Sequence, residues 1–122
     1  MTDAVYIKSG EQPRYFAFSG SLSAGVPATS TPVYKESPFS SFQGIVQGSG
    51  AVSATIIIEF TNDPLTISGV NSNWLGQSTI TLSGAGSATD GFVTSGATWK
   101  WARARVTSIS GTNAFVQVIM GV

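Results

Sequence analysis

The chain has 122 residues, a formal net charge of zero, and charged side chains at only 10% of its positions. This length corresponds to one domain, large enough to bury a core without disulfides or metals. The sequence contains neither Cys nor His. It therefore excludes disulfides and thiolate metal sites, and it lacks the side chain best suited to proton transfer near neutral pH. The six basic residues are spread along the chain, so we expect no nucleic-acid partner.

The same composition bears on association and location. A near-zero net charge gives little long-range repulsion between copies, which favours a homo-oligomer. The first residues lack the basic and apolar segments of a signal peptide, and the longest clean apolar run, Ile56 to Ile58, is too short to span a bilayer. We therefore expect a protein that is made in a cytoplasm and has no membrane partner.

Residues 1–40 differ in composition from the rest of the chain. Four of the five prolines lie here, and proline cannot donate to the ladder of a central strand. The pattern still predicts short edge strands at 5–8, 14–19 and 32–35. We interpret this part as an irregular, proline-containing arm that lies along the domain or reaches a neighbouring subunit.

From residue 41 onward, apolar and polar residues alternate with the period of two that strands require. The alternation predicts strands at 42–48, 52–60 and 78–83. It places Glu59 on an outward, solvated face. Turn signals follow at Gly84-Ala85-Gly86 and at Asp90-Gly91.

The last segment is predicted to be a hairpin. Its strands, 99–109 and 114–122, flank a four-residue connection that contains Gly111. In the first of these strands small apolar residues alternate with Arg103 and Arg105. This pattern indicates an inward apolar face and an outward charged face.

These elements predict an all-β protein. The expected fold is an antiparallel β-sandwich, jelly-roll-like or related, of roughly seven or eight strands. The arm spans residues 1–40 and the sandwich core spans residues 41–122, within a single domain overall.

No residue pattern indicates catalysis. Serines are abundant, but they have no His to serve as base, and no Lys stands in an S-x-x-K pattern. Glu59 and Asp63 could form a carboxylate pair, yet their positions favour a solvated charge and a turn residue. The loop residues that could offer oxygens to calcium form no recognised loop motif; they are Asn62, Asp63, Asn71, Asn73 and Asp90. We expect no enzymatic activity, no metal site and no cofactor.

The tryptophans leave two hypotheses open. Trp99 and Trp101 are two residues apart, so they are expected to share one face of a strand. There they could form a stacking platform for sugars, or they could anchor a subunit interface, where Trp is enriched. We rank the interface first, and we expect Trp74 to plug one end of the fold.

Five segments of the chain carry a resemblance to a known group of proteins. They are residues 56–64, 73–74, 79–84, 90–92 and 99–114. In these segments the chain resembles the small β-sandwich structural proteins of tailed bacteriophages, including head decoration (cement) proteins. The resemblance covers about two-thirds of the chain and does not extend to residues 1–40.

The resemblance implies a non-enzymatic protein of the phage virion. Its role would be capsid decoration, in which many copies bind across capsid subunits and stabilise the shell. A tail or head–tail component is the alternative place, and a carbohydrate-binding module is the alternative function. The implied partners are the major capsid protein or other virion proteins. The expected interface anchors are Tyr15, Phe16, Phe18, Trp99, Trp101, Arg103 and Arg105.

Overall fold

The computed structural model describes residues 5–7, 14–19, 28–30, 32–35, 39–63, 73–94 and 98–121, with backbone alone at 5–7, 14–19 and 28. These ranges contain strands and no helix, which confirms the all-β class. The strands are β1 (Val5–Ile7), β2 (Arg14–Ser19), β3 (Ala28–Thr29), β4 (Val33–Lys35), β5 (Ser40–Thr61), β6 (Leu75–Thr94) and β7 (Trp101–Gly121).

All of these strands belong to one sheet. Its order is β1-β4-β7-β5-β6, and β2 and β3 also pair with β7. Every pair is antiparallel except β1 with β4. The central strand β5 therefore lies between β6 and β7 along its length.

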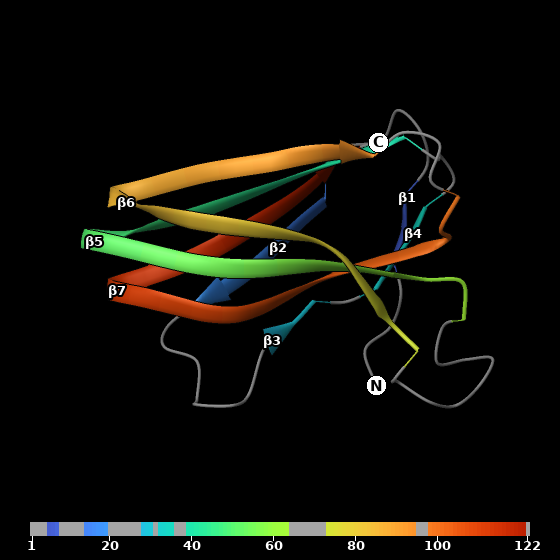
Figure 1. Ribbon diagram of the computed structural model, residues 1–122, viewed down its shortest axis with the longest axis horizontal. Coiled ribbons are helices and arrows are strands. Elements are labelled where there is room, and N and C mark those ends of the chain that lie inside the picture. Colours follow the sequence, from blue (N-terminus) through green and yellow to red (C-terminus); the bar gives the residue numbers. More distant parts are fainter. Residues whose placement is uncertain are drawn as a thin grey trace.

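The three long strands double back at one end of the molecule (Figure 1). In β5, residues 41–47 pair with 87–93 of β6 and 115–121 of β7, whereas residues 53–60 pair with 75–83 of β6 and 102–110 of β7. The ring centroids of Phe42 and Phe60, one from each half of β5, lie 5.8 Å apart in an edge-to-face contact. The sheet is thus a single one, folded over so that two layers face each other. We call these the first layer, with 41–47, and the second layer, with 53–60.

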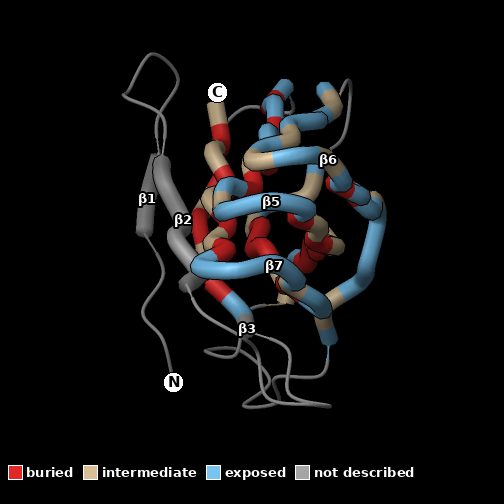
Figure 2. The backbone as a smooth tube through the Cα atoms, turned by 90° about the vertical axis from the view of Figure 1, so that its left-hand side faces the viewer, coloured by how far each residue is buried: buried red, intermediate tan, exposed pale blue. Residues whose placement is uncertain are grey.

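The core fills the space between the two layers. Alternate residues of each long strand point inward, as the pleat requires. Most of these positions are buried in β5 and β7 (Figure 2), whereas in β6 only Ile80 and Leu82 are buried. The buried apolar residues are Val33, Phe42, Val46, Val52, Ala54, Ile56, Ile58, Phe60, Ile80, Leu82, Ala102, Ala104, Val106, Ala114, Val116, Val118 and Met120.

The predicted terminal hairpin is wrong. The chain does reverse near Gly111, but the two halves of β7 do not pair with each other, because each has β5 on one edge and a short N-terminal strand on the other. The halves lie in opposite layers and meet through side chains. Alternation alone cannot separate these two arrangements, since both place the apolar residues of the two halves in one core.

Of the two turns predicted from glycine-containing segments in 84–91, the structure shows one. The chain bends at Gly84 to Gly86, where Gly86 has a φ of 79°. The turn predicted at Asp90-Gly91 is wrong, because both residues lie inside β6 and pair with Gly44 and Gln43 of β5.

Of the short strands in the N-terminal part, β2, β3 and β4 pair with β7, and β1 pairs with β4. The predictions at 5–8, 14–19 and 32–35 correspond to β1, β2 and β4, and β3 was not predicted. β2 covers the first-layer half of β7, and β3 and β4 cover the second-layer half. These strands therefore extend the same sheet.

The corner of β7 gives a test of the folded-over sheet. Gly111 has a φ of 127°, and a Cβ built there would lie 2.8 Å from the Ala51 carbonyl oxygen and 2.9 Å from Val52 Cγ1. Gly111→Ala is expected to lower the free energy of unfolding by about 3 kcal/mol, because the side chain adds overpacking to backbone strain. Urea denaturation monitored by tryptophan fluorescence measures this loss.

Gly50→Ala is the matched control. Gly50 also has a positive φ, 72°, but nothing lies within 4 Å of a Cβ built there. This variant should lose only about 1 kcal/mol, from backbone strain alone. Equal losses in the two variants would contradict the close approach of the β5 and β7 corners.

Candidate interface around Glu59 and the aromatic residues

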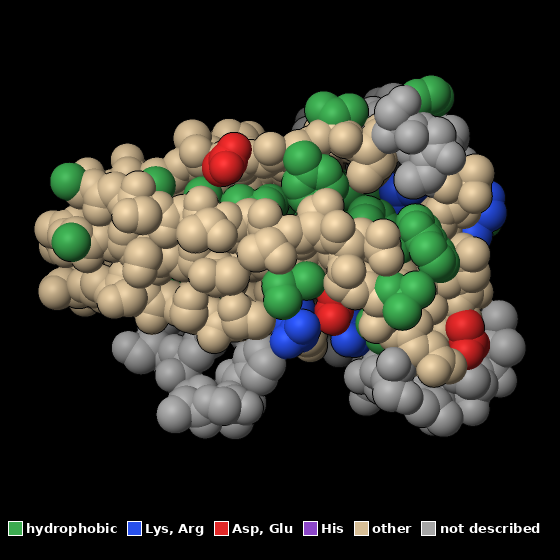
Figure 3. All heavy atoms as spheres, in the orientation of Figure 1, with side chains coloured by type: hydrophobic (Ala, Val, Ile, Leu, Met, Phe, Trp, Pro, Cys, Tyr) green, Lys and Arg blue, Asp and Glu red, His purple; other side chains and the backbone are tan. Residues whose placement is uncertain are grey.

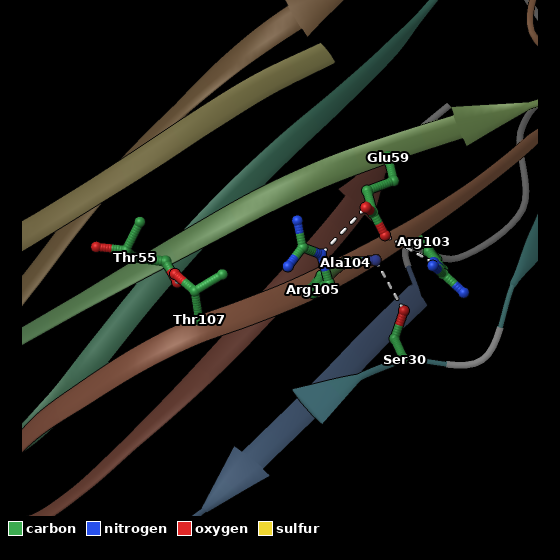
Figure 4. A network of polar contacts seen from close by, with 7 residues as sticks. All are labelled: Ser30, Thr55, Glu59, Arg103, Ala104, Arg105 and Thr107. Carbon is green, nitrogen blue, oxygen red and sulfur yellow. Dashed lines mark hydrogen bonds and ion pairs between the residues drawn. The ribbon is translucent and has the colours of Figure 1, made fainter. Parts of the chain in front are cut away.

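Glu59 is the centre of a buried ion cluster on the outward face of the second layer (Figure 4). Its Oε1 accepts a hydrogen bond from Arg103 Nε at 2.8 Å, and its Oε2 accepts one from Arg105 Nε at 3.1 Å. Glu59 is only 6% exposed. The prediction of a solvated charge is therefore wrong, because two guanidinium groups cover the carboxylate from the neighbouring strand.

The geometry of the cluster follows from sheet register. Glu59 pairs directly with Arg103 across β5 and β7, and Arg105 is two residues further along the same face. The side chain of Arg103 is 10% exposed and that of Arg105 is 30% exposed. The described cluster therefore sets two guanidinium groups against one carboxylate, and Arg105 is its most exposed member.

Two further contacts fix the cluster in place. The Arg103 guanidinium lies 4.4 Å from the centroid of the Trp74 ring, within the range of a cation–π contact. On the other side of β7, the Ser30 N–H donates to the Ala104 carbonyl at 2.9 Å, and the Ala104 N–H donates to Ser30 Oγ at 2.9 Å. Residue 104, between the two arginines, is thereby held by Ser30, the residue that follows β3 (Figure 4).

Lys35 is a buried cation that the sequence analysis did not single out. It is 1% exposed; its Nζ donates to the Trp99 carbonyl at 3.2 Å and lies 5.6 Å from the centroid of the Phe60 ring. The backbone N–H of Lys35 also donates a hydrogen bond to the Lys100 carbonyl. These contacts tie β4 to the segment that precedes β7. Burial, and secondarily the charge of Lys100, lowers the pKa of Lys35 below its ordinary value of 10.5.

The two tryptophans of the predicted platform have different neighbours. Trp99 precedes β7 and packs against the core cluster, and it is only partly buried. Trp101 begins β7, and its ring lies edge-to-face on Tyr34 with centroids 5.2 Å apart. Both tryptophans are partly buried, but Trp101 lies next to the ion cluster along β7, while Trp99 packs against the core.

The remaining predicted anchors lie on β2. In the register with β7, Tyr15 pairs with Ile119, Phe16 with Val118, and Phe18 with Val116. Their side chains lie outside the described part of the structure.

The proposed oxygen ligands are only partly brought together. Asn73 Nδ2 donates to Asp63 Oδ2 at 2.6 Å, and the Asp63 N–H donates to Thr61 Oγ1 at 3.0 Å. The second contact belongs to the turn predicted there. Asp90 lies in β6, and Asn71 is outside the described ranges. Across those ranges no group of three or more acidic, His or Cys side chains gathers, and no helix is long and apolar enough to cross a membrane.

Comparison with known proteins adds no relative. No protein-family model, no curated protein and no solved structure gives a significant match to the chain.

The contribution of the buried Arg103–Glu59 ion pair to the free energy of unfolding can be tested by substitution. Glu59→Gln keeps the shape of the side chain but replaces the carboxylate that pairs with Arg103 and Arg105 by a neutral amide. We expect the free energy of unfolding to fall by about 3 kcal/mol, because the largely buried Arg103 guanidinium loses the ion pair with Glu59. Urea denaturation of both proteins measures the difference.

Arg105→Gln is the control for this prediction. It removes the more exposed partner and leaves the Arg103–Glu59 pair intact, so the loss should be at most about 1 kcal/mol. If Arg105→Gln cost as much as Glu59→Gln, the buried pair would not be the stabilising contact.

Lys35 gives a prediction for pH. Because its pKa is lower in the folded state than in the unfolded chain, the unfolded chain binds more protons as the pH approaches 10.5. Stability should therefore rise with pH over the range from the lowered pKa up to 10.5. Lys35→Met keeps the apolar stem and removes the ammonium, so the slope of unfolding free energy against pH should be smaller in this variant. Identical slopes in wild type and variant would show that Lys35 does not titrate in this range.

Proposed function

We propose that this chain is a non-enzymatic structural protein of a tailed-bacteriophage virion, and that it serves as a capsid decoration protein. The proposal takes the folded-over sheet as a β-sandwich whose outer faces contact neighbouring virion subunits. Many copies bound across capsid-subunit junctions would add buried contact area and lower the free energy of the assembled shell relative to its open forms.

The observation that carries the proposal is the character of the outward surface. Along β6 the outward positions are exposed and carry small or uncharged side chains, namely Gln77, Thr79, Thr81, Ser83, Ala85, Ser87 and Thr89. Few charged side chains are visible on the face in Figure 3. The largest group of charges on the second layer is used internally, between Glu59 and its two arginines. Such a surface is suited to protein contact.

The resemblance in the sequence adds independent support. The segments that carry it include 56–64 and 99–114, which contribute Glu59, Arg103, Arg105 and Trp101. Of the predicted anchors, Trp101 and Arg105 keep partly exposed side chains, and they lie on one outward face of β7. We assign this pair as the capsid-contacting site.

Purified virions of the phage that encodes this chain provide the test. We expect mass spectrometry to detect the protein in many copies per particle, and electron microscopy to place it on the shell. Absence from the particle would overturn the proposal, and density in the tail would replace decoration by the tail or head–tail role.

A binding assay tests the assigned pair. Empty shells assembled without the protein should bind it, and Trp101→Ser with Arg105→Gln should weaken that binding by at least about tenfold, as truncation of interface anchors does. Gln47→Ser, on the exposed outward face of β5, is the matched control and should bind like wild type. Unchanged binding by the double variant would remove these residues from the interface.

A further inference from the structure

The two sides of the three-stranded part formed by β5, β6 and β7 differ in whether further strands pair with them. On one side, β7 is covered by the short strands β2, β3 and β4, and β1 adds to β4. On the other side, β6 pairs with β5, and in the described part of the chain no strand pairs with its outer edge. β6 has 20 residues, so it presents a long row of backbone donors and acceptors in both layers.

The core is also incompletely covered at this edge. Ala88 and Ser78 pair with the fully buried Val46 and Ile58 of β5, yet both are only partly buried. Leu75, which pairs with the buried Phe60, is 49% exposed. In Figure 3, hydrophobic side chains form a strip along the gap between the two halves of β6. The core is therefore only partly covered along β6.

β6 carries few of the features that keep an edge strand from pairing. Natural edges are protected by Lys, by Pro, by short length or by inward-pointing charges. β6 contains no Pro and no Lys or Arg, and its one charged residue is Asp90. The chain as a whole has no net charge to oppose self-association.

We propose that β6 is the interface with a second copy of this chain, in a two-fold dimer joined edge to edge. The bend at Gly84 to Gly86 selects this partner. An extended peptide could pair with only one half of β6, whereas the β6 of a second copy has the same bend and can pair with both halves at once.

The symmetry of this dimer is specific. With the two-fold axis parallel to the strands, the half of β6 before the bend lies antiparallel to the half after the bend in the other copy. Both layers then continue across the interface, and the contact is isologous. This inference concerns the isolated chain and does not depend on a role in a virion.

The test is the association of the purified full-length chain. Sedimentation velocity over a range of concentrations should show a monomer–dimer equilibrium. Hydrogen exchange should show that amides of β6 become more protected as the dimer fills, because the outer edge gains hydrogen-bond partners.

A pair of neighbouring substitutions locates the contact. Ala88→Lys places an ammonium on the inward face of the edge, where it can reach water in the monomer but not in the dimer, so the dimer Kd should rise at least about tenfold. Ser87→Lys adds the same charge one residue away on the exposed outward face and should dimerise like wild type. Ser78→Lys repeats the inward substitution in the other layer and should also weaken the dimer, which covers the case in which Ala88→Lys does not fold.

Three results would overturn the proposal. They are a monomer at all concentrations, a dimer whose β6 amides gain no protection, and a dimer that Ala88→Lys and Ser78→Lys leave unchanged while circular dichroism shows both to be folded. The β6 dimer is tested on the isolated chain, so absence of the protein from virions would overturn the proposed function but not the dimer.

Discussion

The structure depends on the contact between the inward faces of the two layers. Each long strand supplies apolar side chains to both layers, so the bend in each strand brings two parts of the same strand face to face. The Phe42–Phe60 contact within β5 is the clearest case. Burial of apolar surface is the main favourable term in folding, and here it is available only when all three strands bend at the same level. The strained or crowded glycines at the corners are a consequence of that requirement.

The same constraint explains the polar cluster. Because even-numbered residues of the second-layer half of β7 point inward, Arg103 and Arg105 must point outward together, and the register brings Glu59 between them. The carboxylate is then covered by its own two partners, and Trp74 lies against the Arg103 guanidinium. The cluster holds β5 to β7 on the outer face where the core holds them on the inner face.

Much of the fold could be predicted from the sequence. The alternation in 52–60 and the small residues that alternate with Arg103 and Arg105 gave the correct faces, because a strand has only two. The all-β class followed from the strands that the period-two alternation predicts. That the two halves of β7 lie in opposite layers, and do not pair with each other as a hairpin, could not be predicted. A hairpin and a folded-over strand bury the same residues. The burial of Glu59 was missed for a related reason: alternation indicates which face a residue is on, but not what covers that face. Lys35 gave no signal, since its burial depends on Trp99 and Phe60, which are distant in sequence.

The three corners lie side by side at one end of the molecule, and the residues around them are largely exposed (Figure 2). Residues 49–51, 85, 87 and 110–113 are all exposed. Exposed loop tips tolerate insertions better than paired backbone does. Gly50 pairs with no residue of β6 or β7, and nothing lies within 4 Å of a Cβ built there. A foreign peptide grafted at Gly50 would emerge from this end without crossing either layer, which makes the corner end a natural position for displaying added sequence on the protein.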